Sequence, residues 1–128
     1  MKKILLTTTI NTLRGKPITI RDEKDKETPT TIRNYLLTLL SLRFSPQNTK
    51  EVFWTTEIGI LVADEKTKEI ELSDDKIKFL IRLVKANKIK QQLPMGGEKE
   101  IEIFSPVEQA QLLKALMSEE EIKEELSK

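Results

Sequence analysis

The chain has 128 residues, of which 38% are hydrophobic and 34% are charged, and its formal net charge is +1. This length suits one domain with its own core, and the near-neutral charge argues against a dedicated polyanion-binding protein. The sequence contains no cysteine and no histidine. Disulfides, thiol nucleophiles, histidine general bases and most zinc sites are thereby excluded. We therefore expect no enzyme, no cofactor and no metal site.

The chain also lacks the patterns that send a protein to a membrane. The apolar run at residues 4–6 is too short for a signal peptide, and no cleavage site follows it. No run of about 18 apolar residues occurs, so we expect no membrane-spanning segment. A soluble protein of the cytoplasm is the resulting expectation.

The amino-terminal third predicts a β-hairpin. Residues 4–13 predict a strand, because apolar residues and threonines alternate between its two faces. Residues 14–17 predict a turn, since Gly15 tolerates a positive φ and Pro17 suits the edge of a strand. Residues 18–20 then predict the returning strand. The charged segment 21–29 that follows predicts a solvated loop.

Two apolar segments come next. Residues 32–42 have apolar residues at helical spacing and predict a helix that ends near Phe44 and Pro46. Its apolar face is broad, which favours a core position and leaves an oligomer contact as the alternative. Residues 51–62 mix β-branched and aromatic residues with a helix-start signal, and we interpret them as helix over strand. Gly59 would cost about 1 kcal/mol there and requires close packing to explain it.

Residues 69–87 give the clearest prediction, a short strand followed by a capped amphipathic helix. Ile70 and Leu72 share one face of the strand. Ser73 suits the N-cap position, and two aspartates follow it in the first turn, where the helix dipole favours negative charge. Asn87 is a plausible end of the helix. One apolar stripe follows from the spacing of Ile77, Leu80, Ile81 and Val84.

The remaining chain predicts a loop at residues 88–99, which contain a proline and a Gly-Gly pair, and a strand at 100–104. Ser105 and Pro106 predict the start of another helix. The fold class expected from these elements is α+β. We expect a small single domain over residues 1–117, with an N-terminal β-hairpin, short strands and three to four amphipathic helices. Residues 118–128 predict an acidic C-terminal helix or tail.

The candidate interaction residues are four cations and the single tryptophan. These residues are Lys78, Arg82, Lys85, Lys88 and Trp54. Three of the cations recur at helical spacing, and the fourth follows them in the sequence. The cations predict either an ordinary solvated helix face or a basic surface near residues 76–90 that binds nucleic acid. No aromatic residue is interleaved there for base stacking, which favours the solvated face. The tryptophan belongs either to the core or to an interface, where this residue type is enriched.

Four motifs occur in a suggestive order: a Gly-Lys-Pro-Ile turn at residues 15–18, the helix start at 31–36, the strand and cap at 70–77, and a last helix from Ser105. This order and spacing resembles small, uncharacterised accessory proteins of tailed bacteriophages and prophages. The resemblance spans most of residues 4–117, and its motifs are structural. It implies a phage-encoded protein that acts in virion assembly or binds a host protein.

The expected function is therefore binding of another protein, either a phage structural protein or a host protein, in the host cell cytoplasm. The surplus of apolar helical surface also allows a homo-oligomer. The alternative is a nucleic-acid-binding module that uses the basic face of the helix near residues 76–90.

Overall fold

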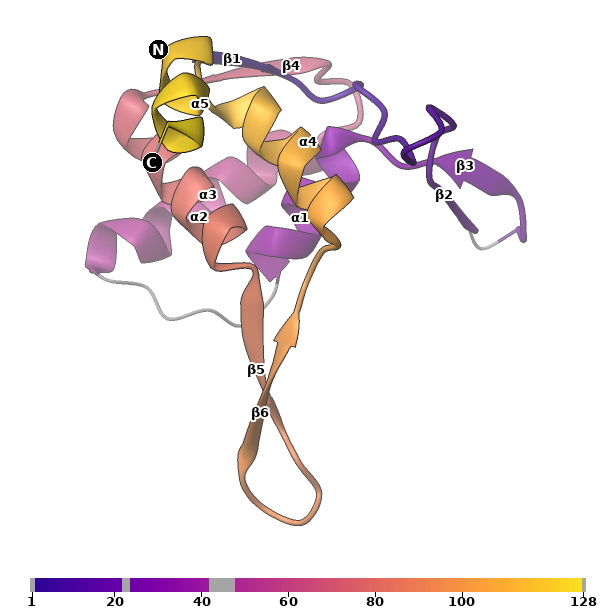
Figure 1. The fold of residues 1–128 in the computed structure, drawn as a ribbon, viewed down its shortest axis with the longest axis vertical. Helices are drawn as coiled ribbons and strands as arrows, with labels where there is room; N and C mark the ends of the chain where they lie inside the picture. Colours follow the sequence, from indigo (N-terminus) through magenta and orange to yellow (C-terminus); the bar gives the residue numbers. More distant parts are fainter. Residues whose placement is uncertain (1, 22–23, 42–47, 128) are drawn as a thin grey trace.

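The computed structural model describes residues 2–21, 24–41 and 48–127, and over these ranges it shows an α+β fold (Figure 1). The described strands form three separate two-stranded antiparallel sheets. The strands are β1 (Lys2–Leu5), β2 (Thr19–Arg21), β3 (Glu27–Pro29), β4 (Glu69–Leu72), β5 (Lys88–Gln92) and β6 (Glu98–Glu102). The helices are α1 (Ile32–Ser41), α2 (Thr49–Ala63), α3 (Asp74–Ala86), α4 (Pro106–Leu116) and α5 (Glu119–Leu126). The α+β class predicted from the sequence is confirmed.

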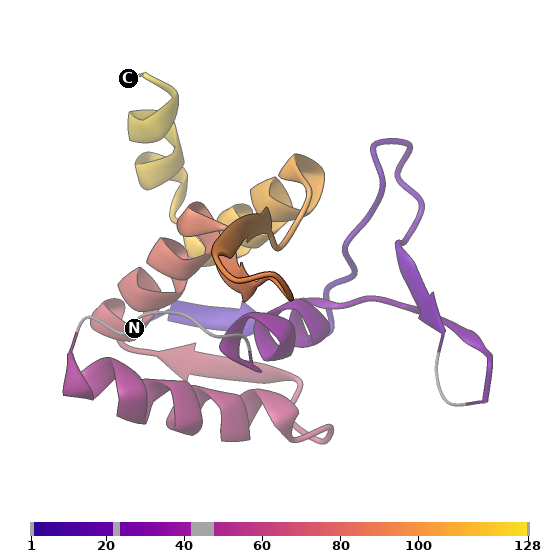
Figure 2. The same cartoon turned by 90° about the horizontal axis from the view of Figure 1, so that it is seen from below.

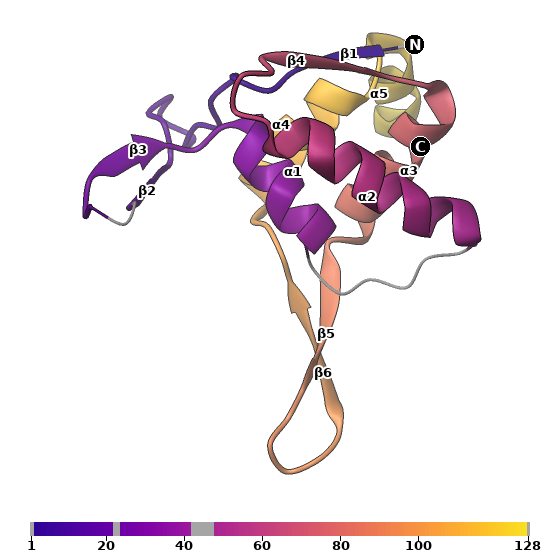
Figure 3. The same cartoon turned by 180° about the vertical axis from the view of Figure 1, so that it is seen from behind.

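The helices form a body from which two β-ribbons project. The ribbon of β1 and β4 crosses one side of the body, whereas β2–β3 and β5–β6 extend away from it (Figures 1 and 3). One contiguous core fills the space between the helices and the β1–β4 ribbon. Its fully buried side chains come from most of these elements, and include Leu6, Leu36, Ile58, Leu80 and Leu112.

The predicted strand–cap–helix unit is confirmed as β4 and α3. The Ser73 hydroxyl accepts a hydrogen bond from the Lys76 backbone N–H, as the N-cap prediction requires. Asn87 ends the helix in the left-handed conformation, with φ of 46°, and its N–H donates to the Leu83 carbonyl. The whole predicted apolar stripe is buried. Local signals were sufficient here because capping and helical periodicity agree.

The amino-terminal hairpin is organised differently from the predicted strand limits. Its turn at Gly15 is present, and the Ile18 N–H donates to the Ile10 carbonyl at 2.8 Å. However, the regular first strand is β1, and it pairs with β4, with Ile4 opposite Ile70. Pairing across some sixty residues of sequence has no local signature, so the alternation alone could not reveal it.

Two segments predicted as loops contain strands, and both predictions are wrong in this respect. Residues 21–29 include β3 and the last residue of β2, with which β3 pairs, whereas Thr19 and Ile20 of β2 lie in the predicted returning strand. Residues 88–99 include β5, which pairs with β6 in a hairpin whose turn places Gly96 and Gly97 at positive φ. The Gly-Gly pair is therefore the turn of a hairpin, and the strand before it is too polar to show as one in the sequence.

The other helices follow their predictions closely. Residues 51–62 lie within α2, so the choice of helix over strand is confirmed. The apolar residues of α1 are buried, which places this helix in the core, while its predicted end near Phe44 and Pro46 lies outside the described residues. Ser105 and Ser118 each begin a helix with a full capping box. The acidic terminal segment is accordingly helical in α5.

Asn87 joins the end of α3 to the base of the β5–β6 ribbon. Its buried amide donates to the Phe104 carbonyl at 2.8 Å and accepts from the Phe104 N–H at 2.8 Å. Both backbone groups of Phe104 are thereby paired by one side chain, next to the point where α4 begins. This contact fixes where the ribbon leaves the body, because buried backbone groups are costly to leave unpaired.

This arrangement predicts different costs for two substitutions of Asn87. Asn87→Gly retains the left-handed backbone and removes the two hydrogen bonds, and we expect a loss of about 2–4 kcal/mol in the free energy of unfolding. Asn87→Ala adds the cost of a side chain at positive φ, about 1 kcal/mol more. Urea denaturation of both variants measures the difference. Two variants that each remain within about 0.5 kcal/mol of the parent, the range of ordinary surface substitutions, would contradict this role.

Candidate protein-binding surface

Helix α2 begins at an N-cap residue, and the face that it packs against the core contains both polar and apolar residues. The Asn48 side chain accepts from the Glu51 N–H at 3.1 Å, which satisfies a free donor of the first turn. Ile58 and Val62 are buried on this inner face. Trp54 is half-buried, and its ring lies 5.9 Å from the ring of Phe79 in α3. The tryptophan therefore contributes to packing between α2 and α3.

A buried ion pair fixes the inner face of α2 against α3. Glu51 is only 5% exposed, and its carboxylate pairs with the guanidinium of Arg82. The same guanidinium lies 5.9 Å from the centre of the Phe79 ring, within range of a cation–π contact. Burial of the carboxylate makes rotation of α2 costly, because any rotation that exposes its inner side separates the charges.

The other end of α2 is fixed by Arg33 of α1. Its guanidinium donates to the Val62 carbonyl at 2.8 Å and also to the carbonyls of Asp64 and Thr67. Carbonyls at a helix C-terminus lack partners within the helix and carry partial negative charge, so a cation suits this position. Helix α2 is thus held at both ends, and the face that it shows to solvent is determined.

Beside the exposed carboxylate of Glu57, the solvent-facing side of α2 carries a largely apolar stripe. We call it the α2 outer face, and by helical spacing it comprises Thr49, Val52, Phe53, Thr56, Gly59, Ile60 and Ala63. Phe53 is 63% exposed and Ile60 is 67% exposed, and Val52 is exposed beside them. The helix lies along the outside of the body in two views (Figures 2 and 3). A surface helix ordinarily presents polar residues to water, so this apolar face is unusual.

Gly59 has no packing explanation within the described residues. A Cβ atom added at this position would meet no atom within 4 Å. Glycine in a helix interior costs about 1 kcal/mol relative to alanine. The prediction from the sequence is that close packing against a neighbour accounts for this cost. The expected close neighbour is absent from the described part of the chain. By helical spacing the glycine lies beside Val52 and Thr56, at the edge of the outer face.

The predicted basic face is largely neutralised by neighbouring acids. Arg82 pairs with Glu51 as described, Lys85 pairs with Glu125 of α5, and Lys88 lies 3.7 Å from a carboxylate oxygen of Glu100. Lys78 is exposed on the side of α3 that faces α5. The four cations therefore do not form one open basic surface in this structure.

One buried contact between α1 and α4 shifts the pKa of both of its partners. The Tyr35 hydroxyl donates to the Glu108 carboxylate. Burial, and then this hydrogen bond, raise the pKa of Tyr35 to about 12. Burial alone would raise the pKa of Glu108, but hydrogen bonds from Tyr35 and Ser105 outweigh it and lower the pKa of this carboxyl. The pair holds the capped start of α4 against α1.

Two other kinds of site, a metal-binding cluster and a membrane-spanning helix, are absent from the described residues. No group of three or more acidic, histidine or cysteine residues is placed to hold a metal ion across 2–21, 24–41 and 48–127. In the same ranges, no helix has both the length and the apolar character needed to cross a membrane. Comparisons with protein-family models, curated proteins and solved structures found no match. The surface geometry is therefore the basis for a functional proposal.

Two ion pairs join α2 and α3, and we predict that breaking them lowers the free energy of unfolding by different amounts. Glu51→Leu leaves Arg82 without its buried partner, and we expect it to cost about 2–4 kcal/mol of unfolding free energy. The matched control is Glu57→Leu, which removes a carboxylate that is 57% exposed and pairs with Lys76 at 3.0 Å, and it should cost less than about 1 kcal/mol. Chemical denaturation measures both.

The double variant Glu51→Leu/Arg82→Met extends this test. It replaces the whole ion pair with apolar groups, so we expect it to recover much of the stability that Glu51→Leu loses. Equal costs for Glu51→Leu and Glu57→Leu would show that the buried pair does not set the orientation of α2.

Proposed function

We propose that this protein acts by binding another protein through the α2 outer face. The observation that carries the proposal is the exposure of two large apolar side chains, Phe53 and Ile60, on the same side of α2. Burying one such side chain contributes about 1.5–3 kcal/mol, and aromatic residues are frequent energetic centres of protein interfaces. Glu57, the carboxylate beside these two side chains, is already paired with Lys76 at 3.0 Å, and it would lie at the polar rim of such an interface.

The shape of the stripe also supports a protein partner. Gly59 has open space in place of a side chain at the edge of the stripe, so a partner can approach the helix backbone closely there. Thr56 lies between Phe53 and Ile60 along the helix and offers a hydroxyl within an otherwise apolar surface. A partner with an apolar ridge that fits beside the glycine would cover both large side chains.

In its concrete form, the proposal is a bacteriophage accessory protein that works in the host cell cytoplasm, in virion assembly or by inhibiting a host protein. This part rests on the resemblance of the turn, cap and helix motifs over residues 4–117. A second copy of the chain is another occupant consistent with an apolar face. The proposal assigns no catalytic role to any residue and requires no cofactor.

Nucleic-acid binding through residues 76–90 is the weaker alternative. Three of the four candidate cations are already paired with carboxylates of the same chain. Each phosphate contact would have to compete with one of these pairs, and the groove beside Lys78 contains no aromatic side chain for base stacking. We therefore favour the protein-binding proposal.

The proposal predicts the behaviour of a Phe53→Ser/Ile60→Ser variant as bait in lysate of the cells that naturally make the protein. The parent chain should capture a defined protein. The amount captured by the variant should be at least ten-fold lower, because two apolar anchors are removed. The matched control is Leu13→Ser/Met95→Ser, which truncates residues that are 88% and 98% exposed away from α2. All four positions are exposed, so each substitution should change stability by no more than about 0.5 kcal/mol.

Retention of the captured protein by the control and its loss from the α2 variant would support the proposal. The proposal fails if both variants capture the same proteins as the parent, or if the parent captures nothing and stays monomeric by light scattering.

A further inference from the structure

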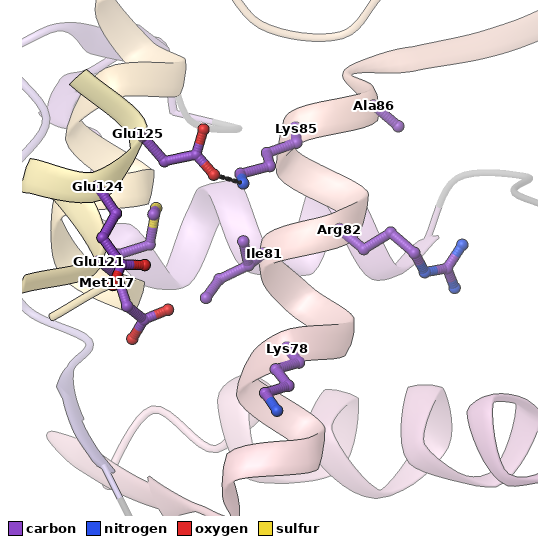
Figure 4. Close-up of a pocket in the computed structure, with 9 residues that line it drawn as sticks. All are labelled: Lys78, Ile81, Arg82, Lys85, Ala86, Met117, Glu121, Glu124 and Glu125. Carbon is purple, nitrogen blue, oxygen red and sulfur yellow. Dashed lines mark hydrogen bonds and ion pairs between the residues drawn. The ribbon is translucent and has the colours of Figure 1, made fainter. Parts of the chain in front are cut away.

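Helix α5 lies against one side of α3 and leaves a groove of about 580 Å³ between them (Figure 4). The groove is at a different place from the α2 outer face, since it involves the side of α3 that faces the C-terminal helix. Its lining residues are Lys78, Ile81, Arg82, Lys85, Ala86, Met117, Glu121, Glu124 and Glu125.

Charges are sorted between the two walls of this groove. Every cation that lines it belongs to α3, and every carboxylate that lines it belongs to α5. Lys85 and Glu125 meet across it in an ion pair, whereas Arg82 extends away from α5 toward its partner Glu51 (Figure 4). Between the charged rims lie the aliphatic side chain of Ile81 and the side chain of Met117. The α3 wall is thus a basic rim around an apolar floor.

Helix α5 is held in this position by few contacts. It has eight residues, none of them buried, and Leu126 is 80% exposed. Ile122 is its partly buried link to the core. The Lys85–Glu125 pair is exposed on both sides, and pairs of that kind contribute about 1 kcal/mol or less. Isolated helices this short are marginal in water, so the docked position of α5 is easily lost.

The connection between α4 and α5 permits such a movement. Met117 and Ser118 join the two helices, and both residues have extended backbone conformations. The capping box at Ser118 belongs to α5 itself and does not depend on docking to α3. Release of α5 would therefore uncover Ile81 and Met117 without breaking any helix.

We propose that α5 is a displaceable cover of the α3 wall of this groove, and that this side of α3 binds an acidic amphipathic helix of a partner protein. The partner helix carries apolar residues on one face, one of them in the place of Ile122, and carboxylates beside them. Its apolar residues cover the floor, and its carboxylates pair with Lys78 and Lys85. Binding requires α5 to leave, so the bound and closed states exclude each other.

The chemistry of the floor favours a helix over a nucleic acid. The lining contains aliphatic and thioether side chains and no aromatic ring, so it offers burial for apolar groups and no stacking surface. Only two of the lining cations, Lys78 and Lys85, are not committed to the α2 contact described above. Two phosphate contacts would give a weak, salt-sensitive complex, whereas a helix adds burial of its apolar face.

The experiment uses the full chain and a fluorescent peptide with the sequence of residues 118–127 as the probe. Ile122→Asp removes the apolar link of α5 and opens the groove in cis. Because only the open fraction binds, we expect at least ten-fold tighter peptide binding by this variant than by the parent in fluorescence anisotropy. Adding Lys85→Glu to Ile122→Asp should weaken binding at least ten-fold, as should raising the salt concentration.

Two controls make the result interpretable. A scrambled peptide of the same composition tests whether the apolar spacing matters, since it retains the charge. If Ile122→Asp does not fold, Glu124→Lys/Glu125→Lys opens the same groove by charge repulsion from Lys78 and Lys85. Both substituted side chains are exposed, so this variant should fold.

Tight binding of the native peptide alone, with loss upon Lys85→Glu, supports the proposal. Equal binding of the scrambled peptide, no gain in the opened variant, or no effect of Lys85→Glu would overturn it. Concentration-dependent dimers that Lys85→Glu abolishes would assign the groove to α5 of a second copy and would also overturn it. None of these readouts involves α2, so the outcome is independent of the function proposed above.

Discussion

The ion pair between Glu51 and Arg82 is the contact on which the arrangement of this molecule depends. A carboxylate that is 5% exposed needs its cation, so α2 is constrained to turn the Glu51 side toward α3. Arg33 holds the opposite end of the helix through three backbone carbonyls. With both ends held, Phe53 and Ile60 face water because the inner side is already filled by Ile58, Val62 and the pair itself.

The same ion pair separates the two surfaces proposed to bind partners. By drawing Arg82 toward α2, it removes the central cation from the basic side of α3 and leaves Lys78 and Lys85 beside α5. The α2 outer face is largely apolar and exposed, whereas the α3 side of the groove is basic and faces α5. These surfaces differ in their chemistry, in the partner each would bind, and in whether the protein must change conformation to use them.

Sequence patterns predicted the elements whose signals are local, and failed where a distant contact decides the outcome. Ser73, the apolar stripe of α3 and Asn87 all follow from capping and periodicity within one segment. Pairing of β1 with β4 and the polar strand β5 had no such signal. The α2 outer face was also missed, because α2 is apolar on both sides and the residue that turns inward is a glutamate, a type usually found in solvent. Trp54 was the aromatic residue predicted as an interface candidate, but it packs on Phe79, and its neighbour Phe53 is the exposed ring.

Site-specific photocrosslinking from the α2 outer face tests the central claim most directly. A photoreactive phenylalanine analogue would replace Phe53 in one variant, Ile60 in a second and, as a control, the still more exposed Leu13 in a third. The variants would be illuminated in the cells that naturally make the protein. Binding through α2 predicts one discrete crosslinked species from positions 53 and 60 and its absence from position 13. Identical products from all three positions, or no product from positions 53 and 60, would contradict the account.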